Sequence, residues 1–266
     1  MIKRMIALII LIASANSQMG IEGKFLQLKP TGSYQYLKRI YRDNANNPQY
    51  TQGFTFLNED TILESAGLYK KSGIHYINLK NVNKLQYRQN LDDKYFGEGC
   101  DIINNKVYQL TWLERKIFVY EKEDLQYIGQ IDLHPSIKEG WGLTHRVQNG
   151  ETQILISDGT SKIHILNEDF ELLKSIQILH VTIPVEYLNE LEYANGILYA
   201  NQYGKTHIFA IDLDKGKVLA KYNFANLVKE ANRPDGCLNG IAFNQKTQTF
   251  WITGKNWPFI QEVKLN

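Results

Sequence analysis

The sequence predicts an all-β chain folded as a five-bladed β-propeller, because a short pattern repeats along it and its composition suits strands. The pattern occurs five times in the 266 residues, and its starts lie 46, 43, 48 and 50 residues apart. That spacing is typical of a propeller blade made of four strands. Aromatic residues make up 12% of the chain, with 16 tyrosines and 11 phenylalanines, which favours a pleated sheet.

The repeated pattern predicts the innermost strand of each blade. Its five copies are Gln52-Gly-Phe-Thr-Phe, Glu98-Gly-Cys-Asp-Ile, Trp141-Gly-Leu-Thr-His, Asn189-Glu-Leu-Glu-Tyr and Asn239-Gly-Ile-Ala-Phe. Second strands are expected at Thr61–Glu64, Val107–Leu110, Gln153–Ile156, Ile197–Ala200 and Thr249–Ile252, and third strands at His75–Leu79, Ile117–Tyr120, Ile163–Leu166, Ile208–Ile211 and Phe259–Val263. Four repeats also contain a fourth strand, at Lys84–Gln89, Leu125–Leu133, Leu172–Leu179 and Val218–Phe224. Turn residues such as Asn195-Gly196 separate the runs, as hairpins require.

The fifth repeat reaches the last residue, Asn266, without a fourth strand. The segment from Ser33 to Tyr41 has the composition of the missing strand. If this segment pairs with the last strand, the ring closes and no long sheet edge stays open. We therefore expect residues 18–266 to form a single propeller domain closed by an N-terminal strand.

Residues 1–17 resemble a secretory signal peptide. Lys3 and Arg4 precede an apolar run from Met5 to Ala13, and Ala15-Asn16-Ser17 offers small residues for cleavage. The apolar run is too short to span a bilayer. The sequence thus predicts a secreted protein with no membrane partner.

Charge and cysteine content exclude several classes of function. The chain has 30 basic and 28 acidic residues, and removing Lys3 and Arg4 leaves 28 of each. A net charge near zero argues against nucleic acid as a partner. Cys100 and Cys237 fall in non-neighbouring repeats and are expected to be buried or free thiols, although a disulfide between them stays open. No Cys/His cluster suggests a metal site, so we expect no metal and no cofactor, and a monomer.

The repeat also predicts a binding site at one mouth of the channel. The first repeat position gathers Gln52, Glu98, Trp141, Asn189 and Asn239 there, and the end of each second strand adds Gly67, Trp112, Gly159, Tyr203 and Lys255. Aromatic walls with a few polar groups are typical of a small-ligand pocket. Taken singly, the tryptophans could be core residues, Glu98 a structural carboxylate and Lys255 a surface lysine. Their coincidence at equivalent repeat positions favours a site.

Nine stretches in order resemble the plant and bacterial type of glutaminyl-peptide cyclotransferase. They are Tyr50-Thr-Gln-Gly-Phe, Glu64-Ser-Ala-Gly-Leu-Tyr, Tyr95-Phe-Gly-Glu-Gly, Gln109-Leu-Thr-Trp, Glu139-Gly-Trp-Gly-Leu-Thr-His, Ser157-Asp-Gly, Leu188-Asn-Glu-Leu-Glu-Tyr, Leu238-Asn-Gly-Ile-Ala and Thr253-Gly-Lys-Asn-Trp-Pro. The resemblance covers the chain from Tyr50 to Pro258. It implies an enzyme that converts the N-terminal glutamine of peptides and proteins to pyroglutamate and releases ammonia.

The resemblance also implies roles for single residues. It assigns the working glutamate to Glu98, the polar substrate-binding positions to Gln52, Asn189 and Lys255, and two aromatic positions to Trp112 and Trp141. Tyr50 stands where family members often have phenylalanine, and Tyr203 where a third tryptophan is usual. Both departures keep an aromatic wall, so activity is expected to survive.

The expected mechanism is metal-independent general acid–base catalysis by Glu98. Two alternatives stay open at the level of sequence. One is a calcium-dependent propeller hydrolase or lactonase, which would use Glu98, Gln52, Asn189 and Asn239 as oxygen ligands. The other is a propeller that binds peptides without catalysis.

Overall fold

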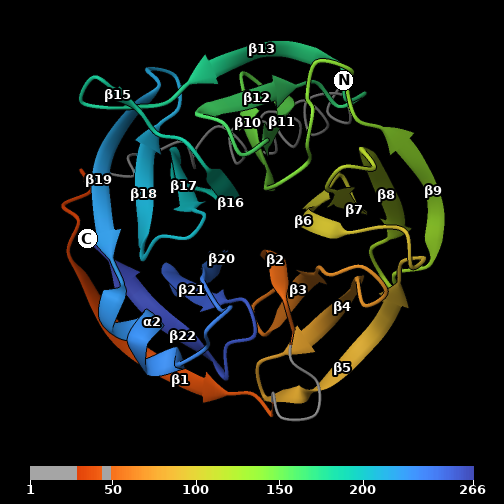
Figure 1. Ribbon diagram of the computed structural model, residues 1–266, viewed down its shortest axis with the longest axis horizontal. Coiled ribbons are helices and arrows are strands. Elements are labelled where there is room, and N and C mark those ends of the chain that lie inside the picture. Colours follow the sequence, from red (N-terminus) through yellow and green to blue (C-terminus); the bar gives the residue numbers. More distant parts are fainter. Residues whose placement is uncertain (1–28, 44–48) are drawn as a thin grey trace, which may run out of the picture.

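The computed structural model of the protein describes residues 29–43 and 49–266, so the predicted signal peptide lies outside the described residues. Five sheets stand around a central channel, as Figure 1 shows. The five-bladed propeller predicted from the repeat is therefore confirmed. No helix in the described ranges is long and apolar enough to cross a membrane.

Each blade runs outward from an inner strand at the channel. Blade 1 is β2 (Thr51–Asn58), β3 (Thr61–Ala66), β4 (Gly73–Asn78) and β5 (Asn81–Asn90). Blade 2 is β6 (Gly97–Ile103), β7 (Lys106–Thr111), β8 (Lys116–Glu121) and β9 (Tyr127–Asp132), and blade 3 is β10 (Leu143–Gln148), β11 (Glu151–Ser157), β12 (Lys162–Leu166) and β13 (Leu172–Gln177). Blade 4 is β16 (Leu188–Ala194), β17 (Ile197–Gln202), β18 (His207–Asp212) and β19 (Lys217–Asn223), and blade 5 is β20 (Leu238–Asn244), β21 (Thr249–Gly254), β22 (Phe259–Leu265) and β1 (Tyr34–Tyr41).

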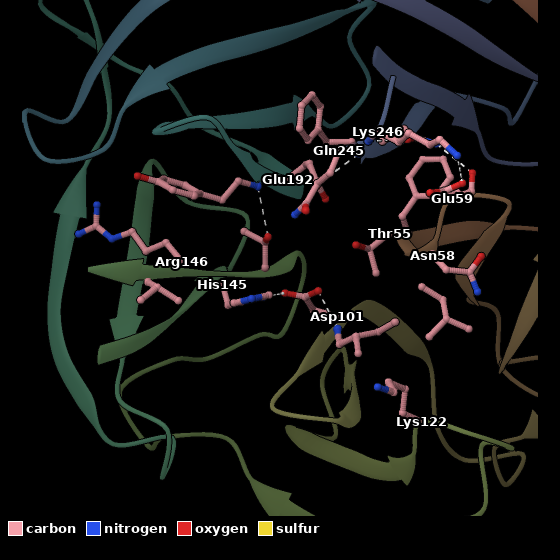
Figure 2. A pocket seen from close by; sticks show the side chains of 18 residues that line it. Thr55, Asn58, Glu59, Asp101, Lys122, His145, Arg146, Glu192, Gln245 and Lys246 are labelled. Carbon is pink, nitrogen blue, oxygen red and sulfur yellow. Dashed lines mark hydrogen bonds and ion pairs between the residues drawn. The ribbon is translucent and has the colours of Figure 1, made fainter. Parts of the chain in front are cut away.

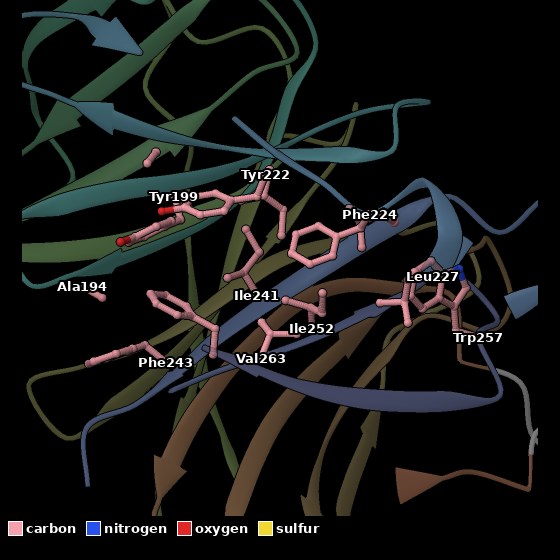
Figure 3. Close-up of a cluster of buried hydrophobic side chains, with 14 of the residues drawn as sticks. Ala194, Tyr199, Tyr222, Phe224, Leu227, Ile241, Phe243, Ile252, Trp257 and Val263 are labelled. Carbon is pink, nitrogen blue, oxygen red and sulfur yellow. The ribbon is translucent and has the colours of Figure 1, made fainter. Parts of the chain in front are cut away.

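The core lies between the blades. The described residues form five apolar clusters, and each cluster joins the facing sides of two neighbouring blades. Figure 3 shows the cluster between blades 4 and 5, where Tyr222 lies beside Tyr199 and Trp257 beside Leu227. Because each sheet is apolar on both faces, it buries both only when a blade stands on either side.

Glycine lets the inner strands approach one another. It follows the first repeat position in four of the five copies. A Cβ on Gly142 would come within 2.0 Å of the Asn189 carbonyl oxygen, and one on Gly99 within 2.5 Å of the Leu143 nitrogen. Neither contact is sterically possible, so these positions require glycine.

The fourth repeat carries Glu190 in place of this glycine. Its buried carboxylate reaches across the channel and accepts hydrogen bonds from the backbone N–H groups of Phe54 and Ile241, at 3.1 and 2.8 Å. Glu190 thus ties three inner strands together.

The N-terminal strand completes the last blade. β1 pairs antiparallel with β22, and Tyr34 lies opposite Leu265. At the end of β1, the buried Arg42 donates to both carboxylate oxygens of Glu64 in blade 1, at 2.8 and 3.1 Å. Burial alone would raise the pKa of Glu64, but Arg42, His75 and Thr51 outweigh it and bring the pKa to about 2. This ion pair locks blade 5 to blade 1 at the point where the ring closes.

Two elements were missed by the sequence analysis. The predicted strand Leu172–Leu179 stops at Gln177, and Leu179 belongs to a small hairpin of β14 (Leu179–His180) and β15 (Ile183–Pro184) on the outer edge of blade 4. A helix, α2 (Ala225–Ala231), follows β19 and buries Leu227 and Ala231 in the cluster of Figure 3. Both short elements cover blade edges. Cys100 and Cys237 are both free thiols.

Candidate active site

One pocket of about 230 Å³ gathers all eight residues that the sequence analysis assigned to the site. It is lined by Tyr50, Gln52, Phe96, Glu98, Trp112, Trp141, Asn189, Tyr203 and Lys255. These residues come from all five blades, and they lie where inner strands begin or where second strands end. Among the described residues that line the pocket, Glu98 supplies the carboxylate and Lys255 the ammonium group.

Irregular strand pairing turns the inner-strand residues toward the mouth. The register between the first and second strands shifts at Thr51/Gly53, Gly97/Cys100, Leu188/Leu191 and Leu238/Ile241. Each shift contains or spans a first repeat position. A β-bulge re-aims the side chain at the irregular residue, which explains how Gln52, Glu98 and Asn189 point into the pocket.

Aromatic side chains form a collar around the mouth. On one side the Phe96 ring lies edge-on to both Tyr50 and Trp112, with ring centroids 6.3 and 5.6 Å apart. On the other side Trp141 and Tyr203 meet at 5.8 Å. Edge-to-face packing at these distances is a favourable arrangement for aromatic rings, so the walls are fixed before a ligand arrives.

Two charged side chains close the collar. The Glu139 Oε2 atom accepts hydrogen bonds from the indole N–H of Trp112, at 2.5 Å, and of Trp141, at 2.9 Å. Opposite, the Lys255 ammonium lies 4.6 Å from the Tyr50 ring centre and 4.8 Å from that of Tyr203. Glu139 therefore joins the two aromatic arcs on one side, and Lys255 joins them on the other.

A chain of amides holds Glu98 at the floor of the pocket. The Gln52 amide donates to Glu98 Oε1 at 2.9 Å, and Asn239 in turn donates to Gln52 Oε1 at 3.1 Å. Glu98 and Gln52 are 5% and 3% exposed. Asn239 was expected at the mouth, but it lies fully buried behind Gln52. No described residue donates to Glu98 Oε2, which leaves this oxygen to a ligand.

Burial raises the pKa of Glu98 well above its ordinary value, because the charged form loses its hydration. The Lys255 charge acts in the opposite direction, and the charges of Glu139 and Glu114 raise the pKa further. A carboxyl group with a raised pKa can both take and return a proton near neutral pH. The floor of this pocket therefore carries a group suited to proton transfer.

Two further polar side chains of the pocket lack a hydrogen-bond or ion-pair partner among the described residues. Asn189 is 2% exposed, and its Oδ1 atom accepts no hydrogen bond from the described residues. Lys255 is 3% exposed, and no carboxylate of the described residues forms an ion pair with it. Buried polar groups normally have partners, so both side chains are available to a ligand.

Sequence reasoning missed Phe96 and Glu139. Both stand two residues before a first repeat position, as Tyr50 stands before Gln52. In four blades the residue just after the second strand donates its backbone N–H to the carbonyl at this earlier position, through Gly67 to Tyr50, Trp112 to Phe96, Tyr203 to Tyr187 and Lys255 to Cys237. Extending the repeat two residues toward the N-terminus would have found both residues.

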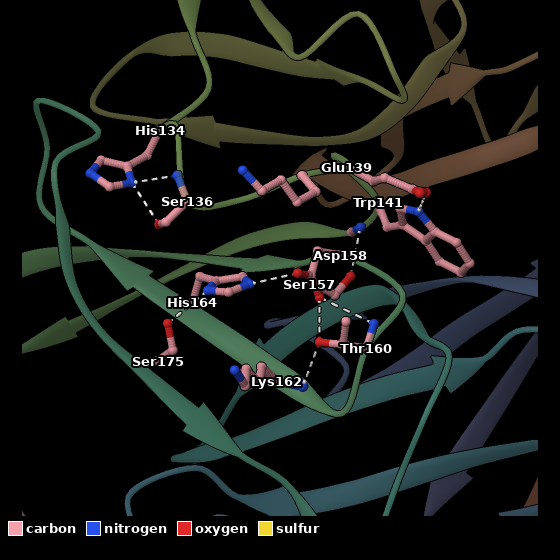
Figure 4. Close-up of polar contacts among 12 residues, drawn as sticks. His134, Ser136, Glu139, Trp141, Ser157, Asp158, Thr160, Lys162, His164 and Ser175 are labelled. Carbon is pink, nitrogen blue, oxygen red and sulfur yellow. Dashed lines mark hydrogen bonds and ion pairs between the residues drawn. The ribbon is translucent and has the colours of Figure 1, made fainter.

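The histidines lie outside this pocket. His164 contacts Asp158 and Ser175 at 2.9 and 2.8 Å, as Figure 4 shows. Equivalent contacts recur in blade 1, between His75 and Glu64, and in blade 4, between His207 and Gln202. A contact repeated between second and third strands is architectural.

A second cavity, of about 640 Å³, lies at the opposite mouth, where the inner strands end. Figure 2 shows two contacts between charged side chains in its lining, His145 with Asp101 at 2.6 Å and Lys246 with Glu59. Arg146 pairs at 3.0 Å with Asp214, which lies just outside the lining. In the described ranges, no group of three or more His, Cys, Asp or Glu side chains is placed to hold a metal ion.

Comparison with known proteins gives consistent matches. Residues 5–265 match the profile of the glutamine cyclotransferase family. A glutaminyl-peptide cyclotransferase of Arabidopsis thaliana is 32% identical over 221 residues, which cover 81% of this chain and 67% of that protein. The crystal structure of Myxococcus xanthus glutaminyl cyclase superposes with a TM-score of 0.77 at 27% identity, over 88% of this chain and 96% of that one. A Bacteroides thetaiotaomicron protein of unknown function superposes with a TM-score of 0.54 at 10% identity, a likeness of fold alone.

Proposed function

The chain belongs to the glutamine cyclotransferase family, and on that premise we propose that its pocket at the channel mouth is the active site of a glutaminyl-peptide cyclotransferase acting on N-terminal glutamine. The observation that carries this proposal is the convergence of nine side chains from five blades on one small pocket with a single carboxylate at its floor. A volume of about 230 Å³ suits one amino-acid residue and leaves the rest of a peptide outside.

The substrate contains both reacting groups. Its α-amine attacks the carbonyl carbon of its own γ-carboxamide, a C–N bond forms to close the lactam, and the original C–N bond breaks to release ammonia. The amine is largely protonated at neutral pH, since its pKa is ~7.7–8.0. It must therefore lose a proton before attack, and the departing nitrogen must gain one.

Glu98 serves both needs in sequence. Its free Oε2 atom takes a proton from the attacking nitrogen and then delivers one to the leaving nitrogen, so the carboxylate is regenerated. Gln52 keeps the Glu98 side chain oriented through its hydrogen bond to Oε1. Positioned proton transfer of this kind contributes ~10²–10⁴-fold to the rate.

The remaining groups hold the cyclising pose. The aromatic collar encloses the side chain of the substrate glutamine and excludes water. Lys255 donates to the oxyanion that develops on the γ-carbonyl oxygen, since it is a cation without a carboxylate partner. Asn189 Oδ1, which lacks a donor, accepts from an N–H group of the bound substrate.

The assay that tests this function is ammonia release from a peptide that begins with glutamine, with mass spectrometry of the product. We expect the product to be lighter by one ammonia and the rate to be unaffected by a chelator. The calcium-dependent alternative predicts that the chelator abolishes turnover. The geometry disfavours this calcium-dependent alternative. A cation shared by Gln52 and Glu98 would need the amide oxygen of Gln52, whereas Gln52 directs its amide N–H₂ group to Glu98. A peptide recovered with unchanged mass would support binding without catalysis.

Glu139 provides a further test as a positioning residue. Glu139→Ala removes the acceptor of both indoles, and we expect KM to rise about tenfold with a smaller change in kcat. Glu139→Gln keeps an acceptor but loses a charge that raises the pKa of Glu98. In that variant KM should stay near that of the parent protein, and the acid limb of the kcat/KM profile should move to lower pH. Equal effects of the two variants on KM would contradict the positioning role.

We also infer, from the N-terminal sequence, that the enzyme is secreted, and we expect it to act as a monomer because one chain supplies every residue of the pocket.

A further inference from the structure

A cationic groove runs beside the active-site pocket. Its volume is about 960 Å³, and it shares Tyr50 with the pocket. Its charged lining residues are Lys70, Lys71, Arg88, Arg233, Asp93 and Asp235. The groove therefore has four cations and two carboxylates in its wall, whereas the whole chain is almost neutral, with 30 basic and 28 acidic residues.

The wall between the groove and the pocket is thin. Gly67 lines the groove, and a Cβ added to it would come within 2.5 Å of the Phe96 ring and 2.9 Å of the Gln52 side chain. On the other side, Asn256 lines the groove and directly follows Lys255 in the chain. The groove thus begins where the pocket ends.

The cations of the groove form no ion pair within the part of the chain that the structure describes. No ion pair among the described residues includes Lys70, Lys71, Arg88 or Arg233. Arg88 is held in place by neutral acceptors, Asn90 Oδ1 at 2.7 Å and the Lys71 carbonyl at 3.2 Å. By contrast, three of the four basic side chains around the cavity at the opposite mouth, Arg146, Lys246 and His145, are each paired with a carboxylate, and the fourth, Lys122, donates to Asn105. The positive charge on the active-site face is therefore available to a ligand.

We propose that this groove binds the second to fourth residues of the substrate peptide and selects substrates with acidic side chains there. The inference rests on the proposed function and names its preferred substrate class. The pocket encloses only one residue, and a peptide advances about 3.3–3.6 Å per residue. Three residues beyond the glutamine therefore span about 10 Å of the groove, whose wall carries the four cations. Carboxylates on these residues meet positive charge that is partly exposed and screened by salt.

Three peptide amides test the preference: glutamine followed by two glutamates, by two glycines, or by two lysines. We expect kcat/KM for the acidic peptide to exceed that for the neutral peptide by about five- to tenfold, mainly through KM. The basic peptide should fall below the neutral one. Raising the ionic strength to 0.5 M, where the screening length is roughly 4 Å, should remove most of the difference.

The double variant Lys71→Glu/Arg233→Glu tests the location. Both side chains are exposed and unpaired, so the fold should persist. The variant should prefer the basic peptide and keep turnover of the neutral peptide within about twofold. The control Lys174→Glu reverses an exposed lysine on the outer strand of blade 3 and should keep the acidic preference.

The two proposals fail in different ways. Ammonia release from the neutral peptide establishes the activity whatever the groove does. Equal kcat/KM values for the three peptides, or an acidic preference that survives the double charge reversal, would overturn the groove proposal. If no peptide turned over, binding of the acidic and neutral peptides followed by tryptophan fluorescence would still decide it, and equal dissociation constants would reject it.

Discussion

Glu98→Gln is expected to lower kcat for a glutamine-initiated peptide by about 10²–10⁴-fold. Glutamine has the shape of glutamate and can still accept the hydrogen bond that Gln52 donates to Glu98 Oε1. The pocket therefore keeps its form and loses the group that transfers protons. Steady-state ammonia release measures the loss, and a variant with near-normal kcat would remove Glu98 from the mechanism.

The same substitution should stabilise the protein at neutral pH. The pKa of Glu98 is higher in the folded protein than its ordinary value of 4.5. Its contribution to stability is therefore complete below the unfolded pKa and is lost as the pH rises through the folded pKa. Denaturant unfolding of the two proteins should give nearly equal free energies at pH 4 and an advantage for Glu98→Gln at pH 8.

Glu192→Gln is the matched control. Glu192 is also a buried carboxyl group whose pKa burial raises, but it lies at the opposite mouth of the channel. This control should gain stability in the same pH range and keep full turnover. Loss of turnover in both variants would mean that the activity responds to buried charge in general and not to Glu98 in the pocket.

Lys255→Ala is expected to lower kcat by about 10²-fold, within the range found when a donor to an oxyanion is removed. It should also shift the acid limb of the pH profile upward. The Lys255 charge is the influence that lowers the pKa of Glu98, so without it the carboxylate forms only at higher pH. Ammonia release measured from pH 5 to pH 9 gives both quantities.

Lys255→Arg separates charge from packing. Arginine keeps a cation over the rings of Tyr50 and Tyr203, so its loss of kcat should be smaller and its acid limb should stay near that of the parent protein. Equal losses of kcat in the alanine and arginine variants, with no shift of the limb, would reduce Lys255 to a packing residue.

The repeat allowed most of the fold to be predicted from sequence. The alternation of strands and turns and the spacing of Gln52, Glu98 and Trp141 predict where each blade begins, because every blade of a propeller is built from the same arrangement of four strands. The hairpin β14–β15 and the helix α2 are each present in one blade only, so no repeat could reveal them. They arise from insertions that cover particular edges, which depend on tertiary contacts.

The position of the site could be predicted from the sequence, but the hydrogen bonds within it could not. Equivalent repeat positions predict from the sequence that Trp112, Asn189 and Lys255 lie at one mouth. The hydrogen bonds could not be inferred in the same way. Asn239 occupies the same repeat position as Gln52, and the register shifts in both blades, yet Asn239 lies buried behind Gln52 and donates to its Oε1 atom.

The pairing of β1 with β22 has a consequence for biosynthesis. Thr31 donates its backbone N–H to the carbonyl of Asn266, and Asn266 donates to that of Ser33. β1 must therefore wait for β22, which is made after the inner strands of all five blades. Until then the apolar flank of blade 1, including Phe54 and Ile62, faces water instead of Trp251 and Ile260. A nascent chain is thus open between blades 5 and 1 until β22 has been made, and loss of residues 260–265, which form most of β22, would leave this face of blade 1 uncovered.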